Sequence, residues 1–110
     1  RLLAEVPGAR MPFGAARPEG EVCGAHLAPV VLEAGIDRDA VIALLAEAGI
    51  QAGVHYRPIH EHPAYAGGVR LPRSEDVARR LLTLPLYPHL TAAQRREVVA
   101  ALAEAIAAAG

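Results

Sequence analysis

The densest group of side chains that could do chemistry lies at 55–65, where the chain reads His-Tyr-Arg-Pro-Ile-His-Glu-His-Pro-Ala-Tyr. Three of the five histidines and two of the three tyrosines fall in this stretch, together with an arginine. Neutral imidazoles bind zinc, whereas arginine holds phosphate and tyrosine and histidine hydrogen-bond the hydroxyls of a sugar. The stretch is therefore a candidate binding segment, and the two chemistries must be told apart.

The spacing of His55, His60 and His62 bears on the metal interpretation. The pattern His-x₄-His-x-His is not a typical zinc spacing, and the single cysteine, Cys23, cannot supply a cysteine cluster. We therefore predict no metal site, although a metal-binding regulatory domain remains a hypothesis that rests on these histidines alone. An anion or sugar site and an ordinary polar loop are the other open interpretations.

Several kinds of chemistry are excluded by residues that the chain lacks. It contains no lysine, since all 11 basic residues are arginine, so no Schiff base to a lysine amine can form on it. Neither a glycine-rich phosphate loop nor a G-x-S-x-G nucleophile turn occurs. We interpret Cys23 and His26 as structural residues and expect His89 to face solvent. No catalytic residue is predicted.

The elements that must position these residues belong to a single domain of 110 residues, of which 53% are apolar, enough for a core. The net charge of −1 excludes a strongly basic nucleic-acid surface. The longest apolar run, 40–46, is far shorter than the ~20 residues that span a bilayer. We predict a cytoplasmic domain with neither a nucleic-acid nor a membrane partner.

Hydrophobic periodicity and turn residues divide the chain into helices and strands. In chain order we predict the end of a helix at 1–6, a loop at 7–21, a strand at 25–32, a helix from Asp37 to Gly49, a strand at 50–56, a loop at 57–73, a helix from Ser74, a short strand at 83–86 and a last helix after Thr91. This order predicts an α/β chain of the α+β kind, a small sheet covered by helices, and leaves the strand order open.

Helix ends carry the clearest local signals. Asp37 is a predicted N-cap, and Thr91 with Gln94 forms the T-x-x-Q capping box. In the helix from Ser74, the acidic Glu75 and Asp76 suit the positive end of the helix dipole. The predicted inward-facing residues of the three helices are Val41, Leu44, Leu45 and Ala48, then Val77, Leu81 and possibly Ala78, then Val98, Leu102 and Ile106.

Two segments together resemble the C-terminal part of the DegT/DnrJ/EryC1/StrS aminotransferases. The first runs from Gly49 to His60 and reads GIQAGVHYRPIH; the second runs from Leu81 to Thr91 and reads LLTLPLYPHLT. Pro-Ala-Tyr at 63–65 lies between them, and the resemblance extends over about 2–108. Each segment alone is a modest signal, and the pair is specific.

The resemblance implies the small C-terminal domain of the fold type I, aspartate-aminotransferase-like architecture. Residues 1–21 would be the end of an interdomain helix and a crossover loop, and 22–110 the small domain. Enzymes of this family, usually homodimers, use pyridoxal phosphate to move an amino group, commonly from glutamate, to a nucleotide-linked keto sugar for polysaccharide or antibiotic sugar synthesis. Their cofactor and its lysine belong to the large domain, so this chain alone should bind no cofactor and be inactive.

Position by position, the resemblance implies substrate contacts for His55, Tyr56 and His60, with Arg57 as a phosphate contact, in a domain that closes over the substrate. The alternative is a stand-alone, non-catalytic binding module derived from that domain. A truncated domain should expose apolar surface where the large domain would lie, whereas an evolved module should carry polar replacements there.

Overall fold

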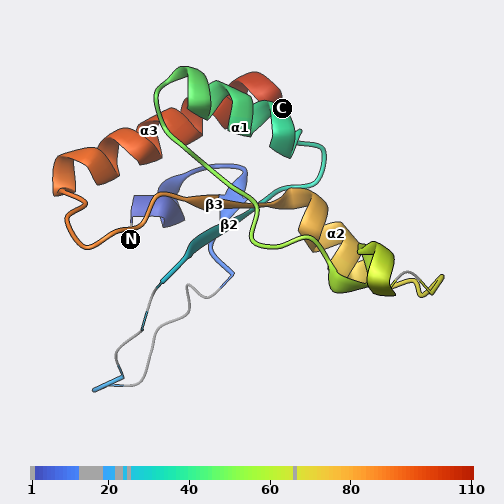
Figure 1. Cartoon of the computed structure of the whole chain (residues 1–110). Coiled ribbons are helices and arrows are strands. Elements are labelled where there is room, and N and C mark those ends of the chain that lie inside the picture. Colours follow the sequence, from blue (N-terminus) through green and yellow to red (C-terminus); the bar gives the residue numbers. More distant parts are fainter. Residues whose placement is uncertain (1, 13–18, 22–23, 25, 66) are drawn as a thin grey trace.

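The computed structural model of the chain describes residues 2–12, 19–21, 24, 26–65 and 67–110. Its described part contains a three-stranded antiparallel sheet in the order β1-β2-β3. Figure 1 shows two long helices, α1 and α3, side by side over one face of this sheet, while α2 extends away from the end of the sheet. The predicted α+β fold, a small sheet covered by helices, is thereby confirmed.

The elements follow one another in chain order. They are the 3₁₀ helix η1 (Leu2–Glu5), β1 (Ala9–Arg10), β2 (Ala28–Leu32), α1 (Arg38–Glu47), the 3₁₀ helices η2 (Ile59–Glu61) and η3 (Pro63–Tyr65), α2 (Pro72–Arg80), β3 (Leu81–Leu84) and α3 (Ala92–Ala109). None of the described helices, the 18-residue α3 included, is long and apolar enough to cross a membrane.

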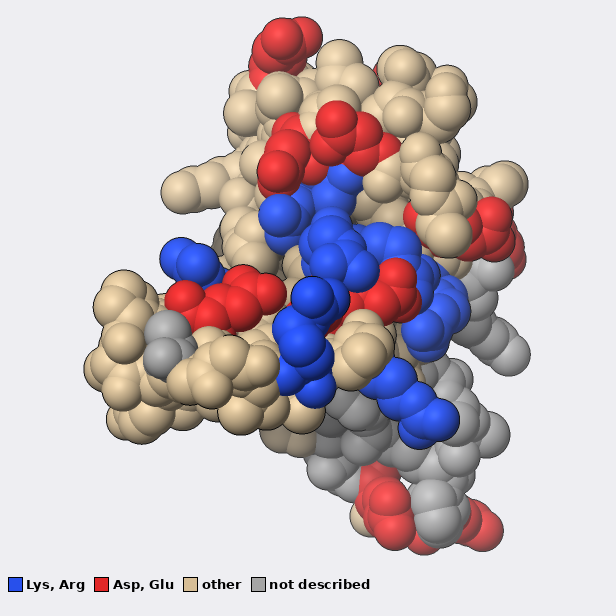
Figure 2. Space-filling view, turned by 90° about the vertical axis from the view of Figure 1, so that its right-hand side faces the viewer, with Lys and Arg blue, Asp and Glu red and all other residues tan. Residues whose placement is uncertain are grey.

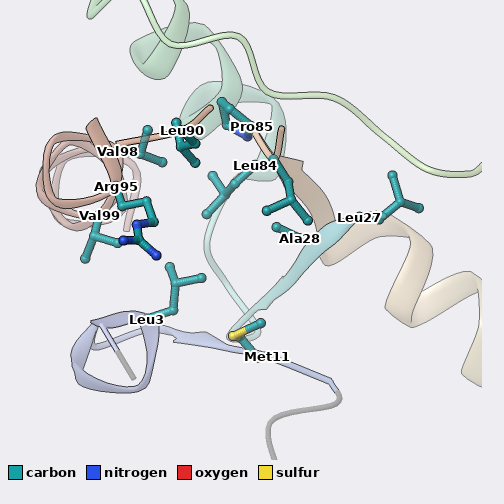
Figure 3. A pocket seen from close by; sticks show the side chains of 11 residues that line it. Leu3, Met11, Leu27, Ala28, Leu84, Pro85, Leu90, Arg95, Val98 and Val99 are labelled. Carbon is teal, nitrogen blue, oxygen red and sulfur yellow. The ribbon is translucent and has the colours of Figure 1, made fainter. Parts of the chain in front are cut away.

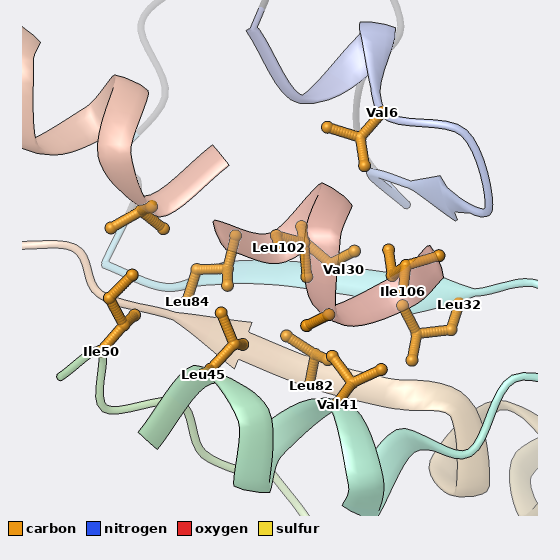
Figure 4. Close-up of a cluster of buried hydrophobic side chains, with 12 residues drawn as sticks. Val6, Val30, Leu32, Val41, Leu45, Ile50, Leu82, Leu84, Leu102 and Ile106 are labelled. Atoms are coloured by element: carbon orange, nitrogen blue, oxygen red, sulfur yellow. The ribbon is translucent and has the colours of Figure 1, made fainter. Parts of the chain in front are cut away.

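The core lies between the sheet and the two covering helices (Figure 4). Side chains alternate along a strand, so β2 sends Val30 and Leu32 into the core. Opposite Val30, β3 contributes Leu82, and α3 contributes Leu102. Leu32, Leu82 and Leu102 are completely excluded from solvent. Burial of such side chains is the main stabilising contribution in this half of the molecule.

Both predicted helix caps are confirmed. The Asp37 side chain accepts hydrogen bonds from the backbone N–H groups of Asp39, at 2.9 Å, and Ala40, at 3.2 Å. The Gln94 N–H donates to Thr91 Oγ1 at 3.2 Å, while the Thr91 N–H donates to Gln94 Oε1 at 2.9 Å. These bonds satisfy donors that the first helical turn leaves unpaired.

The prediction of inward-facing residues is confirmed in α3, holds in part in α1, and fails in α2. In α3, Val98, Leu102 and Ile106 are buried. In α1, Val41 and Leu45 are buried, whereas Leu44 is half-buried and Ala48 is exposed. In α2, by contrast, Val77 and Ala78 are only half-buried, as is Leu81 just after it.

The strand predicted at 50–56 is wrong. Only Gly53 pairs with β3, through a bond from its N–H to the Thr83 carbonyl at 3.0 Å and a return bond at 2.7 Å. The segment crosses the edge of β3 instead of running along it, so its alternating apolar residues do not share a face. Ile50 is buried at the end of the core, whereas Tyr56 is 71% exposed.

The N-terminal loop predicted at 7–21 contains a short strand, β1, that pairs Ala9 with Leu32. Gly8 precedes it with a φ of +79°, and a Cβ there would lie 2.8 Å from Ile106 and 2.9 Å from Ile36. Both the backbone conformation and the close packing therefore require glycine. The helix end predicted at 1–6 is the 3₁₀ helix η1.

Two other boundaries are shifted. α2 begins at Pro72 instead of Ser74, because proline lacks an N–H and suits the first turn of a helix. It ends at Arg80, and β3 follows at once, so that strand occupies 81–84 and not 83–86. Cys23 lies outside the described residues. His26 and His89 are both exposed, as predicted for His89.

Candidate functional site

The segment after Gly53 leaves the edge of β3 and passes over α2, where it forms η2 and η3 (Figure 1). It carries all four residues predicted to contact substrate. The structure brings His55 and Tyr56 together: their rings meet edge to face, with centroids 5.0 Å apart and an interplanar angle of 82°. The peptide bond between them is cis.

His55 is half-buried and lines a pocket of about 260 Å³ beside β3, whose walls are largely apolar. Its polar lining comes from four residues, His26, Gln51, His55 and Thr83. The His55 Nδ1 and Thr83 Oγ1 atoms are buried without a hydrogen-bond partner among the described residues. Because both atoms are buried, neither is open to a ligand in the pocket.

Tyr56 and Arg57 point away from that pocket. The Tyr56 side chain is among the most exposed large side chains of the molecule. Arg57 Nε lies 3.4 Å from Glu61 Oε2, in an ion pair between two exposed side chains one helical turn apart in sequence. Pairs of this kind contribute little to stability. Both side chains are therefore available to a ligand.

His60 is placed differently from the other three predicted residues. Its side chain is only 10% exposed, and its Nε2 lies 3.3 Å from Glu75 Oε1. Glu75 is the one buried residue of α2. His60 thus packs against the start of α2, and the four predicted residues do not converge on one point.

Glu75 is the residue that sequence reasoning missed. Its carboxylate accepts the backbone N–H of Leu71 at 2.8 Å and both Nε and Nη2 of Arg70, at 3.2 and 3.0 Å. The Leu71 N–H, then the Arg70 guanidinium and His60, hold the pKa of this carboxyl below its ordinary value of 4.5. A glutamate four residues after the residue that caps a helix was the available sequence signal, since it can reach back to that N–H.

Two arginines join α2 to the rest of the molecule. Arg38, in the first turn of α1, donates from Nη1 to the carbonyls of Ala78, at 3.3 Å, and Leu81, at 3.2 Å. Arg80 donates from Nη1 to the Leu32 carbonyl at the end of β2, at 2.8 Å, and pairs with Asp76. The Arg80 side chain lowers the pKa of Asp76 in turn.

Arginine side chains gather in the middle of the face that Figure 2 shows, interleaved with acidic groups. One depression of about 330 Å³ on this part of the molecule is lined by Arg38, Val54, Arg57, Pro58, Glu61, Glu75, Ala78 and Arg79. Three of these residues are cationic and two are acidic, so the depression combines positive charge with carboxylates that compete for it.

An apolar groove of about 460 Å³ lies on another side of the domain (Figure 3). It runs between η1, the start of β2, the end of β3 and the start of α3, and Arg95 reaches into it. Its aliphatic lining includes Leu3, Leu84 and Val99. Met11 and Leu86, on the same groove, are 38% and 41% exposed. The groove thus leaves apolar side chains partly open to solvent.

The residues present do not fit pyridoxal phosphate. Holding that cofactor covalently needs a lysine amine, and the chain has none. The described residues also contain no group of three or more histidine, cysteine or acidic side chains placed to hold a metal ion. On this face the exposed Tyr56 can offer a hydrogen bond, and the arginines of the depression can offer ion pairs.

Comparison with known proteins places these observations in a family. The profile of the DegT/DnrJ/EryC1/StrS aminotransferase family matches residues 1–103. A relative, the dTDP-4-dehydro-2,3,6-trideoxy-D-glucose 4-aminotransferase of Saccharopolyspora spinosa, is 40% identical over 98 residues, which are 89% of this chain and 25% of that protein. The chain thus spans about a quarter of the length of this curated relative.

Solved structures agree. The aminotransferase TlmJ from Streptoalloteichus hindustanus superposes with a TM-score of 0.82 at 29% identity, over 97% of this chain and 28% of TlmJ. A DegT/DnrJ/EryC1/StrS aminotransferase from Brucella abortus gives a TM-score of 0.75 at 25% identity, over 96% of this chain and 27% of that one.

Proposed function

The chain belongs to the DegT/DnrJ/EryC1/StrS aminotransferase family, and we propose that it is the small C-terminal domain of an enzyme that transfers an amino group to a nucleotide-linked keto sugar. The observation that carries this proposal is the 40% identity to an aminotransferase of a dTDP-linked dehydro sugar. Residues 22–110 form most of the domain, and 1–21, which would connect it to the rest of the enzyme, add Val6 to its core and β1 to its sheet.

In this proposal the polar face contacts the substrate and closes over it. His55, which lines the 260 Å³ pocket beside β3, hydrogen-bonds a hydroxyl of the sugar. The exposed Tyr56 adds a donor at the rim, and Arg57 pairs with a phosphate. His60 acts as a positioning residue, since its contact with Glu75 joins the substrate-binding segment to α2.

Pyridoxal phosphate, with the lysine that holds it, would be supplied by the part of the enzyme that this chain does not contain. That group supplies the amino-transfer chemistry when it is bound. Glutamate as the amino donor and assembly as a homodimer belong to the same proposal. The chain alone is then expected to be inactive in transamination.

The stand-alone binding module is the competing function. The apolar groove argues against it, because a domain evolved to stand alone should carry polar side chains where a large domain would otherwise pack. Instead the groove exposes Met11 and Leu86, and Tyr87 beside it is 47% exposed.

The mass of the native polypeptide separates the two functions. We would isolate the protein from its source and determine its intact mass and its N-terminal residue. A chain longer by a few hundred residues upstream of Arg1, with a lysine in that part, supports the aminotransferase. A native chain of these 110 residues excludes transamination by this polypeptide and favours the binding module.

A further inference from the structure

The arginines around α2 differ in whether their guanidinium groups contact a partner within the molecule. Most of them contact a partner: Arg38 contacts the carbonyls of Ala78 and Leu81, Arg57 contacts Glu61, Arg70 contacts Glu75, and Arg80 contacts Asp76 and the Leu32 carbonyl. Arg73 and Arg79, both exposed, form no ion pair or side-chain hydrogen bond with any described residue. These two guanidinium groups therefore retain their full capacity to bind an anion.

Arg79 shares the 330 Å³ depression with Arg57, which reaches it from the segment that passes over α2. Arg38 lines the same depression with a side chain only 17% exposed, held in place by its bonds to the end of α2. Cationic side chains from three different elements thus converge on one hollow. Its remaining walls, Val54, Pro58 and Ala78, are apolar or nearly so.

The two carboxylates of the depression are not equivalent. Glu75 is buried, and its carboxylate is hydrogen-bonded to the Leu71 N–H, to Arg70 and to His60. Its negative charge is therefore already neutralised within the protein. Glu61 instead meets Arg57 at 3.4 Å, and both side chains are exposed, at 39% and 63%. Such a long, solvated pair is weak, so another anion can replace Glu61 on Arg57.

We infer that this depression is a subsite for the diphosphate of a nucleotide, bound between the guanidinium groups of Arg57 and Arg79, with Glu61 as the internal anion that it displaces. Arginine binds phosphate oxygens through paired, charge-assisted hydrogen bonds, and a diphosphate offers oxygens to two such groups at once. The inference deepens the proposed function and rests on it for the substrate, although anion binding itself can be measured separately.

The test measures binding of inorganic pyrophosphate, thymidine diphosphate and thymidine by calorimetry to the full polypeptide that carries this chain. Arg79→Gln and Arg57→Gln should each weaken thymidine diphosphate binding at least about tenfold, since each removes a charged hydrogen bond. Glu61→Gln should strengthen binding about two- to fivefold, because it removes the competing anion. Thymidine, which carries no phosphate, should show no dependence on any of these residues.

Arg73→Gln is the matched control. Arg73 lies on the same helix, is equally without a partner among the described residues, and lines a neighbouring depression with Tyr56. Its replacement changes the net charge by the same amount and should leave pyrophosphate binding within about twofold, because Arg73 does not line the 330 Å³ depression and its exposed charge is screened by salt. Equal losses for Arg79→Gln and Arg73→Gln would overturn the subsite. Weaker thymidine diphosphate binding by Glu61→Gln would also overturn the subsite, because it would show that the Arg57–Glu61 pair holds the depression in shape instead of competing with the ligand.

Two further readouts separate this inference from the proposed function. The first readout is the KM for a nucleotide-linked keto sugar in the double variant Arg57→Gln, Arg79→Gln. If the polypeptide transaminates this sugar and the KM of the double variant is unchanged, the subsite is wrong and the proposed function stands. If thymidine diphosphate binds through Arg79 but no keto sugar is aminated, the subsite stands and the proposed function fails. Unchanged thermal unfolding of each variant shows that a loss of binding is not a loss of folding.

Discussion

The face of the sheet covered by α1 and α3 differs from the α2 end of the molecule in what its buried side chains contact. Under the two long helices, Leu45, Leu82 and Leu102 touch other apolar groups and are fully excluded from solvent (Figure 4). At the other end, the buried residue of α2 is Glu75, and α2 is joined to its surroundings by hydrogen bonds and ion pairs.

The two regions therefore contribute differently: the apolar core holds the fold together, and the polar end positions α2. Apolar burial is strong but non-directional, so it holds the sheet and the long helices together without specifying any one polar group's position. Hydrogen bonds are individually weaker in net terms but directional, so those from Glu75, Arg38 and Arg80 set where α2 lies. The segment that carries the candidate site residues passes over α2, and its position therefore depends on polar contacts.

The strongest test of the comparison is Leu102→Ala in the apolar core. Leu102 is fully buried, so we expect the free energy of unfolding to fall by about 2–5 kcal/mol, from lost apolar contact plus the cavity left behind. Chemical denaturation measures this loss. The control is Leu86→Ala, whose side chain is 41% exposed and which should cost much less; equal costs would contradict the assignment of the core.

Glu75→Gln should act locally at the polar end. Replacing the carboxylate by an amide removes the charge that Arg70 and His60 contact and weakens the bond from the Leu71 N–H. We expect faster amide hydrogen exchange in α2 and in η2, while α1 and α3 keep their protection. Glu61→Gln, which alters only an exposed pair, is the control, and similar exchange in the two variants would show that Glu75 is not the residue that organises this end.

Acid should loosen the same end first. The pKa of Glu75 is lowered from 4.5 and that of Asp76 from 3.8, so each contributes stability at higher pH that is lost as pH falls through its lowered value. Between pH 5 and 8 these two groups should contribute no pH dependence. Below that range, hydrogen exchange in α2 should accelerate before exchange in α3, and Glu75→Gln should reduce the effect. Simultaneous loss of both helices would refute this order.

The smallest expected effect is that of Tyr56→Phe on the proposed enzyme. Tyr56 is 71% exposed, so losing its hydroxyl should leave the free energy of unfolding unchanged. If it donates one hydrogen bond to the substrate, the KM for the keto sugar should rise about two- to tenfold. Tyr87→Phe, an exposed tyrosine outside the candidate site, is the control; identical kinetics for the two variants would remove Tyr56 from the site.

Local signals were read correctly from the sequence. The cap at Asp37 and the capping box of Thr91 and Gln94 involve atoms within three residues of each other, so their geometry is decided by the chain itself. The resemblance likewise located the polar segment and the family, because both depend on residue order and not on contacts.

Errors arose where a contact joins distant residues. The alternation at 50–56 predicted a strand, but only Gly53 reaches β3. The pairing of Ala9 with Leu32 was missed, since a two-residue strand has no periodicity of its own. Glu75 was interpreted as a helix-dipole partner, although its neighbours also include His60, 15 residues earlier in the sequence.

By itself, therefore, the sequence determined where α1 and α3 begin, which apolar face α3 buries, the family, and the absence of a lysine that could hold the cofactor. Only the tertiary structure decided that His55 lines a pocket beside β3, that His60 packs against Glu75, and that Arg57 and Arg79 share a depression. The physical reason is the distance along the sequence over which each interaction acts. Caps and periodicity act within a few residues, whereas burial and pairing of a polar group depend on segments that only folding brings together.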